Sequence, residues 1–98
     1  MGIMKPIRFV LADDHNLMRS GLKALLSGMP GVEVVTEATN SRESVEMVNS
    51  TNPDVVLMDI GMKELNGVEA AALIARDRPS VRVVCFPCTA PRILYRRL

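Results

Sequence analysis

The sequence predicts an α/β fold, a doubly wound parallel sheet with helices on both faces. Three short apolar runs are rich in β-branched residues, are of strand length and scarcely alternate with polar residues. Runs of this kind suit strands buried on both faces, as in a parallel sheet covered by helices. Helical patterns separate the runs, so the expected order is βαβαβαβ with right-handed crossovers. The length of 98 residues suits one compact domain.

The four predicted strands differ in their patterning. The runs that scarcely alternate cover Ile7–Ala12, Val55–Met58 and Val81–Phe86, the last interrupted only by Arg82. Val32–Ala38 is more polar and alternates, which favours an edge strand.

The first helix is predicted between the first two strands. Its apolar residues recur at helical spacing and are Leu17, Met18, Gly21, Leu22, Leu25 and Leu26. Gly28, followed by Pro30, gives it a normal helix end.

Two N-cap signals predict where the second and third helices begin. Asn40 is followed three positions later by Glu43, and Asn66 by Glu69, an arrangement related to the capping box. The stripes expected to pack on the sheet are Val45 and Val48 on the second helix and Val68, Ala71, Ala72, Ile74 and Ala75 on the third.

Composition excludes several classes of protein. With 48% hydrophobic and 23% charged residues, the chain is expected to be a soluble globular protein and not a membrane span. A net charge of +1 gives no basic field for non-specific nucleic-acid binding, so no direct nucleic-acid contact is expected. The segment Met1–Pro6 does not read as a signal peptide, and a cytoplasmic location is the default expectation.

Two cysteines stand close together near the end of the chain. Cys85 and Cys88 have the spacing of a redox dithiol, but that motif belongs at a helix start. Cys85 is therefore expected to be a buried strand residue.

Three acids follow strands of the predicted sheet. Asp13 and Asp14 come directly after the first strand, and Asp59 closes the third. In doubly wound sheets, ligands bind beyond the carboxyl ends of the strands where the strand order reverses, so these acids should converge. Repelling carboxylates can hold a cation, and oxygen ligands select Mg²⁺. Aspartate can also accept a phosphoryl group, although each acid taken alone could be a turn residue.

Four segments carry a resemblance to a known family. Phe9–His15, Pro53–Ile60, Met62 and Leu65–Gly67 resemble the receiver domain of bacterial response regulators. The Ala-Asp-Asp-His start resembles the NarL/FixJ branch of that family. The resemblance covers residues 7–86 and implies a flavodoxin-like (CheY-like) receiver fold that lacks the fifth strand and fifth helix.

The resemblance also implies roles for the acids. Asp59 would accept a phosphoryl group from a sensor histidine kinase, which makes the chain a phospho-accepting regulatory domain and not an enzyme. Asp14 would bind Mg²⁺ directly, Asp13 would hold it through water, and the carbonyl of Gly61 would complete the ligands. A full-length parent would carry a DNA-binding helix-turn-helix and regulate transcription.

The chain departs from the family pattern in three places. Lys63 stands where the family has Pro, and Pro87 stands where it has Ser or Thr. The chain ends at Leu98, before the Lys that pairs with the phosphate. Residues 1–86 are therefore interpreted as an incomplete receiver domain. Residues 87–98 are interpreted as a divergent tail, frameshifted, because one added nucleotide before Pro87 allows the reading Ser-Met-His-Arg.

Two other functions compete with phosphoryl acceptance. Loss of the fifth strand and helix would leave a sheet edge and a face of the first helix uncovered, so a homodimer or domain-swapped oligomer is expected. The alternative function is an inactive, truncated or swapped receiver that acts only as an interaction module. A phosphatase with an Asp nucleophile on the first strand would need a second Asp two positions on, and Asn16 stands two positions after Asp14. His15 could be a ligand or a base, but it directly follows the acid pair and is expected to start the first helix, where a polar residue is ordinary.

Overall fold

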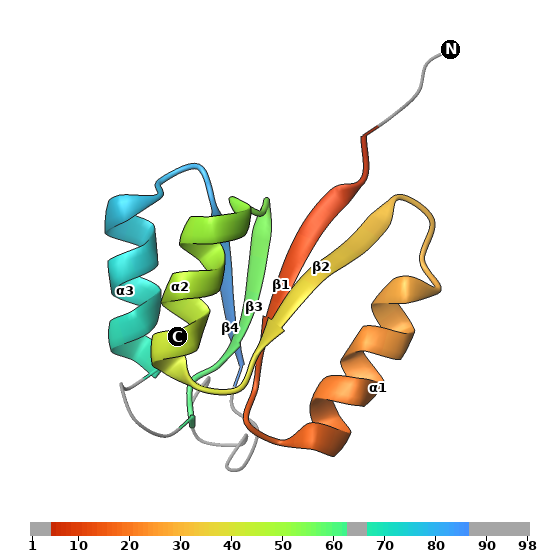
Figure 1. The fold of residues 1–98 in the computed structure, drawn as a ribbon, viewed down its shortest axis with the longest axis horizontal. Coiled ribbons are helices and arrows are strands. Elements are labelled where there is room, and N and C mark those ends of the chain that lie inside the picture. The colour runs from red at the N-terminus through yellow and green to blue at the C-terminus, as the bar shows by residue number, and fades with distance from the viewer. Residues whose placement is uncertain (1–4, 63–66, 87–98) are drawn as a thin grey trace.

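The predicted α/β class and element order are confirmed by the computed structural model, which describes residues 5–62 and 67–86 (Figure 1). The elements are β1 Ile7–Ala12, α1 Asn16–Ser27, β2 Val32–Ala38, α2 Ser41–Thr51, β3 Val55–Asp59, α3 Gly67–Asp77 and β4 Arg82–Phe86. The predicted strands match to within one residue at either end. The described residues hold four strands and no fifth.

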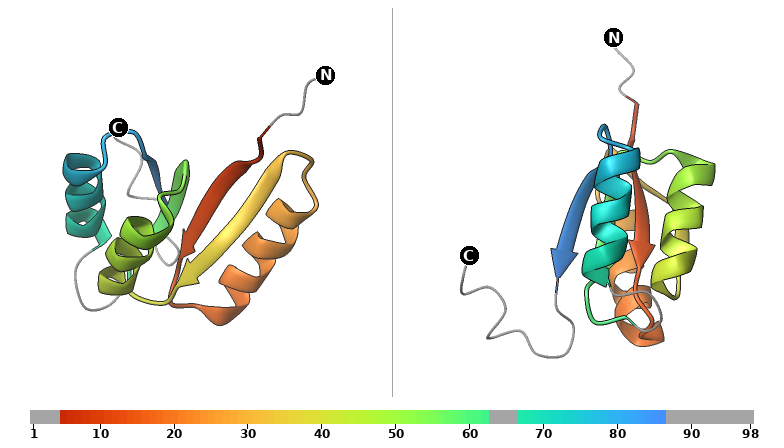
Figure 2. Two further views of the ribbon diagram at one scale, coloured as in Figure 1. Left: turned by 45° about the horizontal axis from the view of Figure 1, so that its top comes forward. Right: turned by 90° about the vertical axis from the view of Figure 1, so that its left-hand side faces the viewer.

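The four strands form one parallel sheet in the order β2-β1-β3-β4. Across the sheet, β2 lies on one side of β1, and β3 and then β4 lie on its other side, so the direction of strand addition reverses after β2. Right-handed crossovers therefore place α1 on one face of the sheet and α2 and α3 on the other. Figures 1 and 2 show α2 and α3 side by side, with α1 apart from them next to β2. The doubly wound topology is as predicted.

The hydrophobic core lies between the sheet and the pair of helices α2 and α3. Alternate residues of β1 and β3 point into it and are fully buried, namely Val10, Ala12, Val56 and Met58. Val48 of α2 packs among them, as the predicted stripe requires. Burial of each large aliphatic side chain contributes about 1.5–3 kcal/mol, so this layer supplies most of the hydrophobic stabilisation in the described part of the chain.

The face predicted for α3 is largely wrong. Its buried residues are Gly67, Ala70 and Ile74. Val68 is 57% exposed, and Ala72 is also exposed. Because alanines stand at neighbouring positions, two overlapping stripes of small residues run along α3. The helix buries the stripe of Gly67, Ala70 and Ile74 and exposes the one that contains Val68 and Ala72. Periodicity alone cannot choose between two such stripes.

The predicted cap of α2 is present. The Asn40 side chain accepts a hydrogen bond from the Glu43 backbone N–H at 2.7 Å. The Glu43 carboxylate in turn accepts from the Thr39 backbone N–H at 2.6 Å, one residue earlier than in a standard capping box. The predicted end of α1 is also confirmed, because the N–H of Gly28 bonds back to carbonyls of the last turn. Asn66 lies outside the described residues.

β4 is an edge strand, since within the described residues it pairs only with β3. Val84 is 42% exposed, and Cys85 is exposed as well, so the expectation of a buried Cys85 is wrong. β4 has a neighbouring strand on one side only in the described part of the chain, so less of its surface is covered than that of the central strands β1 and β3. β2 is the opposite edge, as its alternation predicted. Cys88 and the rest of residues 87–98 lie outside the described residues.

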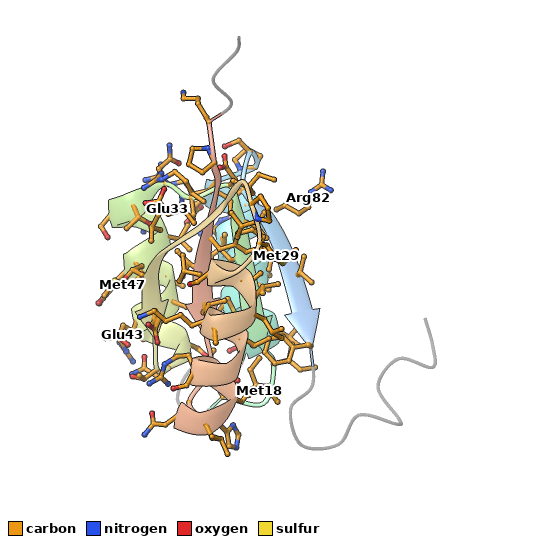
Figure 3. All side chains as sticks on the ribbon, turned by 90° about the vertical axis from the view of Figure 1, so that its right-hand side faces the viewer. Met18, Met29, Glu33, Glu43, Met47 and Arg82 are labelled. Atoms are coloured by element: carbon orange, nitrogen blue, oxygen red, sulfur yellow. The ribbon has the colours of Figure 1, made fainter. Side chains whose placement is uncertain are left out.

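α1 has an apolar face that nothing covers in the described part of the chain. None of its residues is buried, and Leu17 and Leu25 are 86% and 68% exposed. An open apolar hollow of about 670 Å³ runs along the helix and includes Gly21 and Leu22. Figure 3 shows Met18 near the start of α1 and Met29 just beyond its end. The uncovered face predicted for the first helix is therefore observed.

The helices described are all too short or too polar to cross a membrane.

Two matched truncations test this asymmetry of burial. Ile74→Ala should lower the free energy of unfolding by about 2–4 kcal/mol, because Ile74 is 2% exposed and its removal leaves a cavity. Leu25→Ala on the uncovered helix face should change it by less than about 0.5 kcal/mol. Urea denaturation followed by circular dichroism measures both. Comparable losses in the two variants would mean that the α1 face is covered in solution.

Candidate functional site

The strand ends bring three acids together. Asp13 and Asp14 directly follow β1, and Asp59 is the last residue of β3. β1 and β3 are neighbours, with Ala12 opposite Met58. The reversal of strand order falls between them, which is where ligands collect in doubly wound sheets. One ligand atom from each acid, together with one from His15, lies within 4.8 Å of the others.

Two of these carboxyl groups are taken fully out of water. Asp13 and Asp59 are completely buried, whereas the Asp14 side chain keeps 20% of its surface exposed. Asp13 Oδ1 accepts the backbone N–H of His15 at 2.8 Å, and Asp13 Oδ2 has no hydrogen-bond partner among the described residues. A buried carboxylate charge is costly unless it is paired, so this cluster favours a bound cation.

The turn after β3 is held by backbone contacts. The Gly61 N–H donates to Asp59 Oδ1 at 2.9 Å, and the Ile60 N–H donates to the Phe86 carbonyl at 3.0 Å. The Asp59 carboxylate is therefore oriented by the residue two positions on. Met62 is 5% exposed and packs in the hydrophobic core. Lys63 lies outside the described residues.

His15 does more than start α1. It is the N-cap residue, but its side chain makes no capping hydrogen bond. Its Nδ1 instead lies 3.1 Å from Asp13 Oδ1, 3.1 Å from Asp14 Oδ1 and 3.7 Å from Asp59 Oδ2. Its position directly after two acids was the one signal in the sequence, and it did not show which way the ring turns.

Arg19 braces the loop that carries the first two acids, a role that the sequence analysis missed. Its Nη1 donates to the Asp13 carbonyl at 2.7 Å, and its Nε donates to Glu37 Oε1 at 2.9 Å. Lys23 Nζ lies 2.9 Å from the other Glu37 oxygen. These contacts join α1, the end of β1 and the edge strand β2. The only hint was a charged residue four positions after His15, one helical turn along α1.

Gly67 lets α3 begin directly against the end of β3. A Cβ at this position would lie 2.5 Å from the Ile60 Cα and 2.9 Å from the Asp59 carbonyl oxygen. These are backbone atoms that no side-chain rotation can move away. A shift of the start of α3 would therefore displace the backbone at Asp59 and Ile60.

Glu37 is the acid that the two basic residues of α1 hold in place. The hydrogen bond from Lys23 lowers the pKa of Glu37 below its ordinary value of 4.5. Burial acts in the opposite direction, and the hydrogen bond from Arg19 adds to the lowering. The brace is thus stabilised by the ionised form of Glu37.

The family model of the response regulator receiver domain matches residues 9–91. The chain belongs to this family. Its acid cluster lies at the carboxyl ends of β1 and β3, within the matched segment. Receiver domains generally bind Mg²⁺ at such an acidic pocket.

Similar proteins also place this chain among the response regulators. It is 44% identical over 78 residues to the transcriptional regulatory protein DegU of Brevibacillus brevis, covering 80% of this chain and 33% of DegU. It is 36% identical over 86 residues to the nitrate/nitrite response regulator NarL of Escherichia coli K12, covering 88% of this chain and 40% of NarL. The chain thus spans about a third to two-fifths of these relatives. The expected likeness to the NarL branch is confirmed.

Solved structures show the same fold. The receiver domain of the putative response regulator NarL from Mycobacterium tuberculosis has a TM-score of 0.84 and 30% identity, covering 91% of this chain and 72% of that one. The response regulator domain of Thermotoga maritima CheB has a TM-score of 0.81 and 35% identity, covering 91% and 68%. The predicted CheY-like fold of this receiver domain is confirmed.

Gly67 and Gly21 form a matched pair that tests the close approach at Asp59. Gly67→Ala should destabilise the fold by about 1–3 kcal/mol, because the new methyl group overlaps the backbone of Ile60. Gly21→Ala on α1 should stabilise it by about 0.5–1 kcal/mol, since the methyl group meets nothing nearby and alanine favours helix. The urea midpoint should fall in Gly67→Ala and rise in Gly21→Ala, relative to the wild-type chain. A neutral Gly67→Ala would contradict the close approach.

Glu37→Gln tests the brace through pH. Because the folded-state pKa of Glu37 is lowered, its stabilisation is present above the unfolded value near 4.5 and is lost as pH falls through the folded value. The substitution should lower the free energy of unfolding by up to about 1 kcal/mol at pH 7, a modest cost because the ion pairs of Glu37 with Arg19 and Lys23 are partly solvated. At pH 3 the cost should be smaller, because Glu37 is then more protonated. Thermal unfolding of both proteins between these pH values measures the difference. A cost independent of pH would exclude this charge effect.

Proposed function

We propose that this receiver domain accepts a phosphoryl group on Asp59 from a sensor histidine kinase in a Mg²⁺-dependent reaction. The observation that carries the proposal is the fully buried Asp59 carboxylate at the end of β3, beside Asp13 and Asp14. Family membership supports a regulatory role for the domain. The assignment of Asp59 as acceptor rests on its position at the reversal of strand order.

The donor set fits Mg²⁺. The three carboxylates offer oxygen ligands, which this hard ion prefers, and the unpartnered Asp13 Oδ2 supplies a buried charge to be offset. We assign Asp14 and Asp59 as direct ligands, Asp13 as a ligand through water and the Gly61 carbonyl as the remaining protein ligand. Mg²⁺, when bound, would offset the charge that the carboxylates and the phosphoryl oxygens bring together.

The chemistry then depends on Asp59 itself. One carboxylate oxygen would form a bond to phosphorus while the bond from phosphorus to the donor's nitrogen or oxygen breaks, and the donor would leave with that electron pair. The product is an acyl phosphate on Asp59. The Gly61 N–H, which donates to Asp59 Oδ1, would hold the carboxylate in one orientation during the attack.

We propose that the parent protein regulates transcription. The relatives DegU and NarL are named as regulators, and this chain spans only part of their length. A DNA-binding segment, the kinase partner and a cytoplasmic location follow from that likeness as proposals. The role of a phospho-accepting domain without enzymatic turnover of its own is proposed on the same basis. The division at residue 86 and the frameshifted tail of residues 87–98 stay predictions.

A second candidate is an interaction module that acts without phosphorylation. It is favoured by the exposed apolar face of α1 and by the edge strand β4. Both features leave apolar or backbone groups available for another chain. A homodimer or domain-swapped oligomer stays a prediction of this candidate.

Intact mass spectrometry after incubation with acetyl phosphate separates the two candidates. The wild-type chain should gain the mass of one phosphoryl group only when Mg²⁺ is present. Asp59→Asn should abolish the gain, whereas Asp77→Asn, an exposed aspartate at the end of α3, should leave it unchanged.

The opposite result is equally informative. No gain by a wild-type chain that is folded by circular dichroism would favour the interaction module. A gain that persists in Asp59→Asn would place the acceptor at another residue.

A further inference from the structure

We infer that His15 is a nitrogen ligand of the cation held by Asp13, Asp14 and Asp59. The inference rests on the metal site of the proposed function and adds one ligand to it. It also changes which ion the site prefers, because an imidazole joins a set that would otherwise contain only oxygen.

The distances around the ring fit a coordination shell. Ligand atoms at right angles on an octahedral ion with bonds of about 2.1 Å lie about 3.0 Å apart. His15 Nδ1 is 3.1 Å from Asp13 Oδ1 and 3.1 Å from Asp14 Oδ1. Asp59 Oδ2, at 3.7 Å, lies between the adjacent spacing and the opposite spacing of about 4.2 Å. Nδ1 therefore lies at the spacing of an adjacent ligand from Asp14. It is also close enough to Asp59, and to Asp13 as a ligand through water, to share one ion with them.

A hydrogen bond from the ring satisfies the cluster less well. Nδ1 can carry one proton and donate it well to one acceptor, yet three carboxylate oxygens surround it. Asp13 Oδ1 already accepts the His15 backbone N–H, and the fully buried Asp13 Oδ2 has no partner among the described residues. A divalent cation with Nδ1 as a ligand would offset two of the three carboxylate charges at once.

The backbone presents the ring to the cluster without help from packing. His15 has an extended conformation with φ −97° and ψ 110°, and its N–H is fixed on Asp13 Oδ1. Its side chain keeps 46% of its surface exposed and makes no capping hydrogen bond. Neither the core nor the helix depends on this imidazole, so replacing it should leave the fold intact.

The expected consequence is a preference for first-row transition ions. Imidazole suits ions such as Zn²⁺, Fe²⁺ and Ni²⁺ better than Mg²⁺, which prefers carboxylates, carbonyls and water. Mn²⁺ is the suitable probe, because it accepts oxygen ligands as readily as nitrogen and is paramagnetic.

The experiment compares wild-type protein with His15→Phe, which keeps a planar ring without a ligand atom. Continuous-wave EPR titration with Mn²⁺ alone should show binding by His15→Phe that is weaker by at least about tenfold, because removal of even an outer partner of a metal ligand typically costs about 10–100-fold in affinity. Mg²⁺ affinity, measured by competition with Mn²⁺, should change much less. Pulsed EPR of wild-type protein with Mn²⁺ should show coupling to an imidazole nitrogen that is absent from His15→Phe.

The outcomes separate this inference from the proposed function. If wild-type protein binds Mn²⁺ and Mg²⁺ but shows no nitrogen coupling and the same Mn²⁺ affinity as His15→Phe, only the histidine ligand is wrong. If it binds neither ion, the metal site and the inference both fail. Because the nitrogen signal is read on wild-type protein, the test does not depend on the folding of the variant.

Discussion

The reversal of strand order between β1 and β3 is the constraint on which the rest of this structure depends. Because β1 lies between β2 and β3, its carboxyl end and that of β3 open into the same crevice. Two acids from the first loop and one from the third strand are thereby brought within a few ångströms. The same reversal sends α1 to one face and α2 and α3 to the other. The site and the layered architecture thus have one geometric origin.

Burial is unequal on the two faces of the sheet. The side that carries α2 and α3 holds the core, whereas α1 has no buried residue. The acid cluster is tied to both sides. Arg19 of α1 holds the Asp13 carbonyl, and Gly67 of α3 lies against the backbone at Asp59. Movement of either helix would therefore shift the backbone that carries the carboxylates. The two helices nevertheless contribute very differently to the stability of the described part of the chain.

The electrostatics of the site follow from burial more than from charge number. Asp13 and Asp59 are out of water, so their repulsion is poorly screened, and a cation is the simplest compensation. His15 reaches into the same cluster from the loop after β1. The brace around Glu37, by contrast, is partly solvated and consists of opposite charges. It holds the loop, whereas the buried acids form the cluster that we propose binds a cation.

The sequence by itself determined the order of the elements, the four strands, the cap at Asn40 and the three acids at strand ends, because each depends on local periodicity or on residues that are near in the chain. Tertiary structure decided the rest. It set the buried face of α3 through the approach of Gly67 to Ile60, left Cys85 exposed on an edge strand and turned the His15 ring toward the carboxylates. The exposure of Cys85 depends on pairing between distant strands. The Gly67 and His15 contacts join residues that are near in the chain, but their distances are fixed only when the sheet and helices pack together.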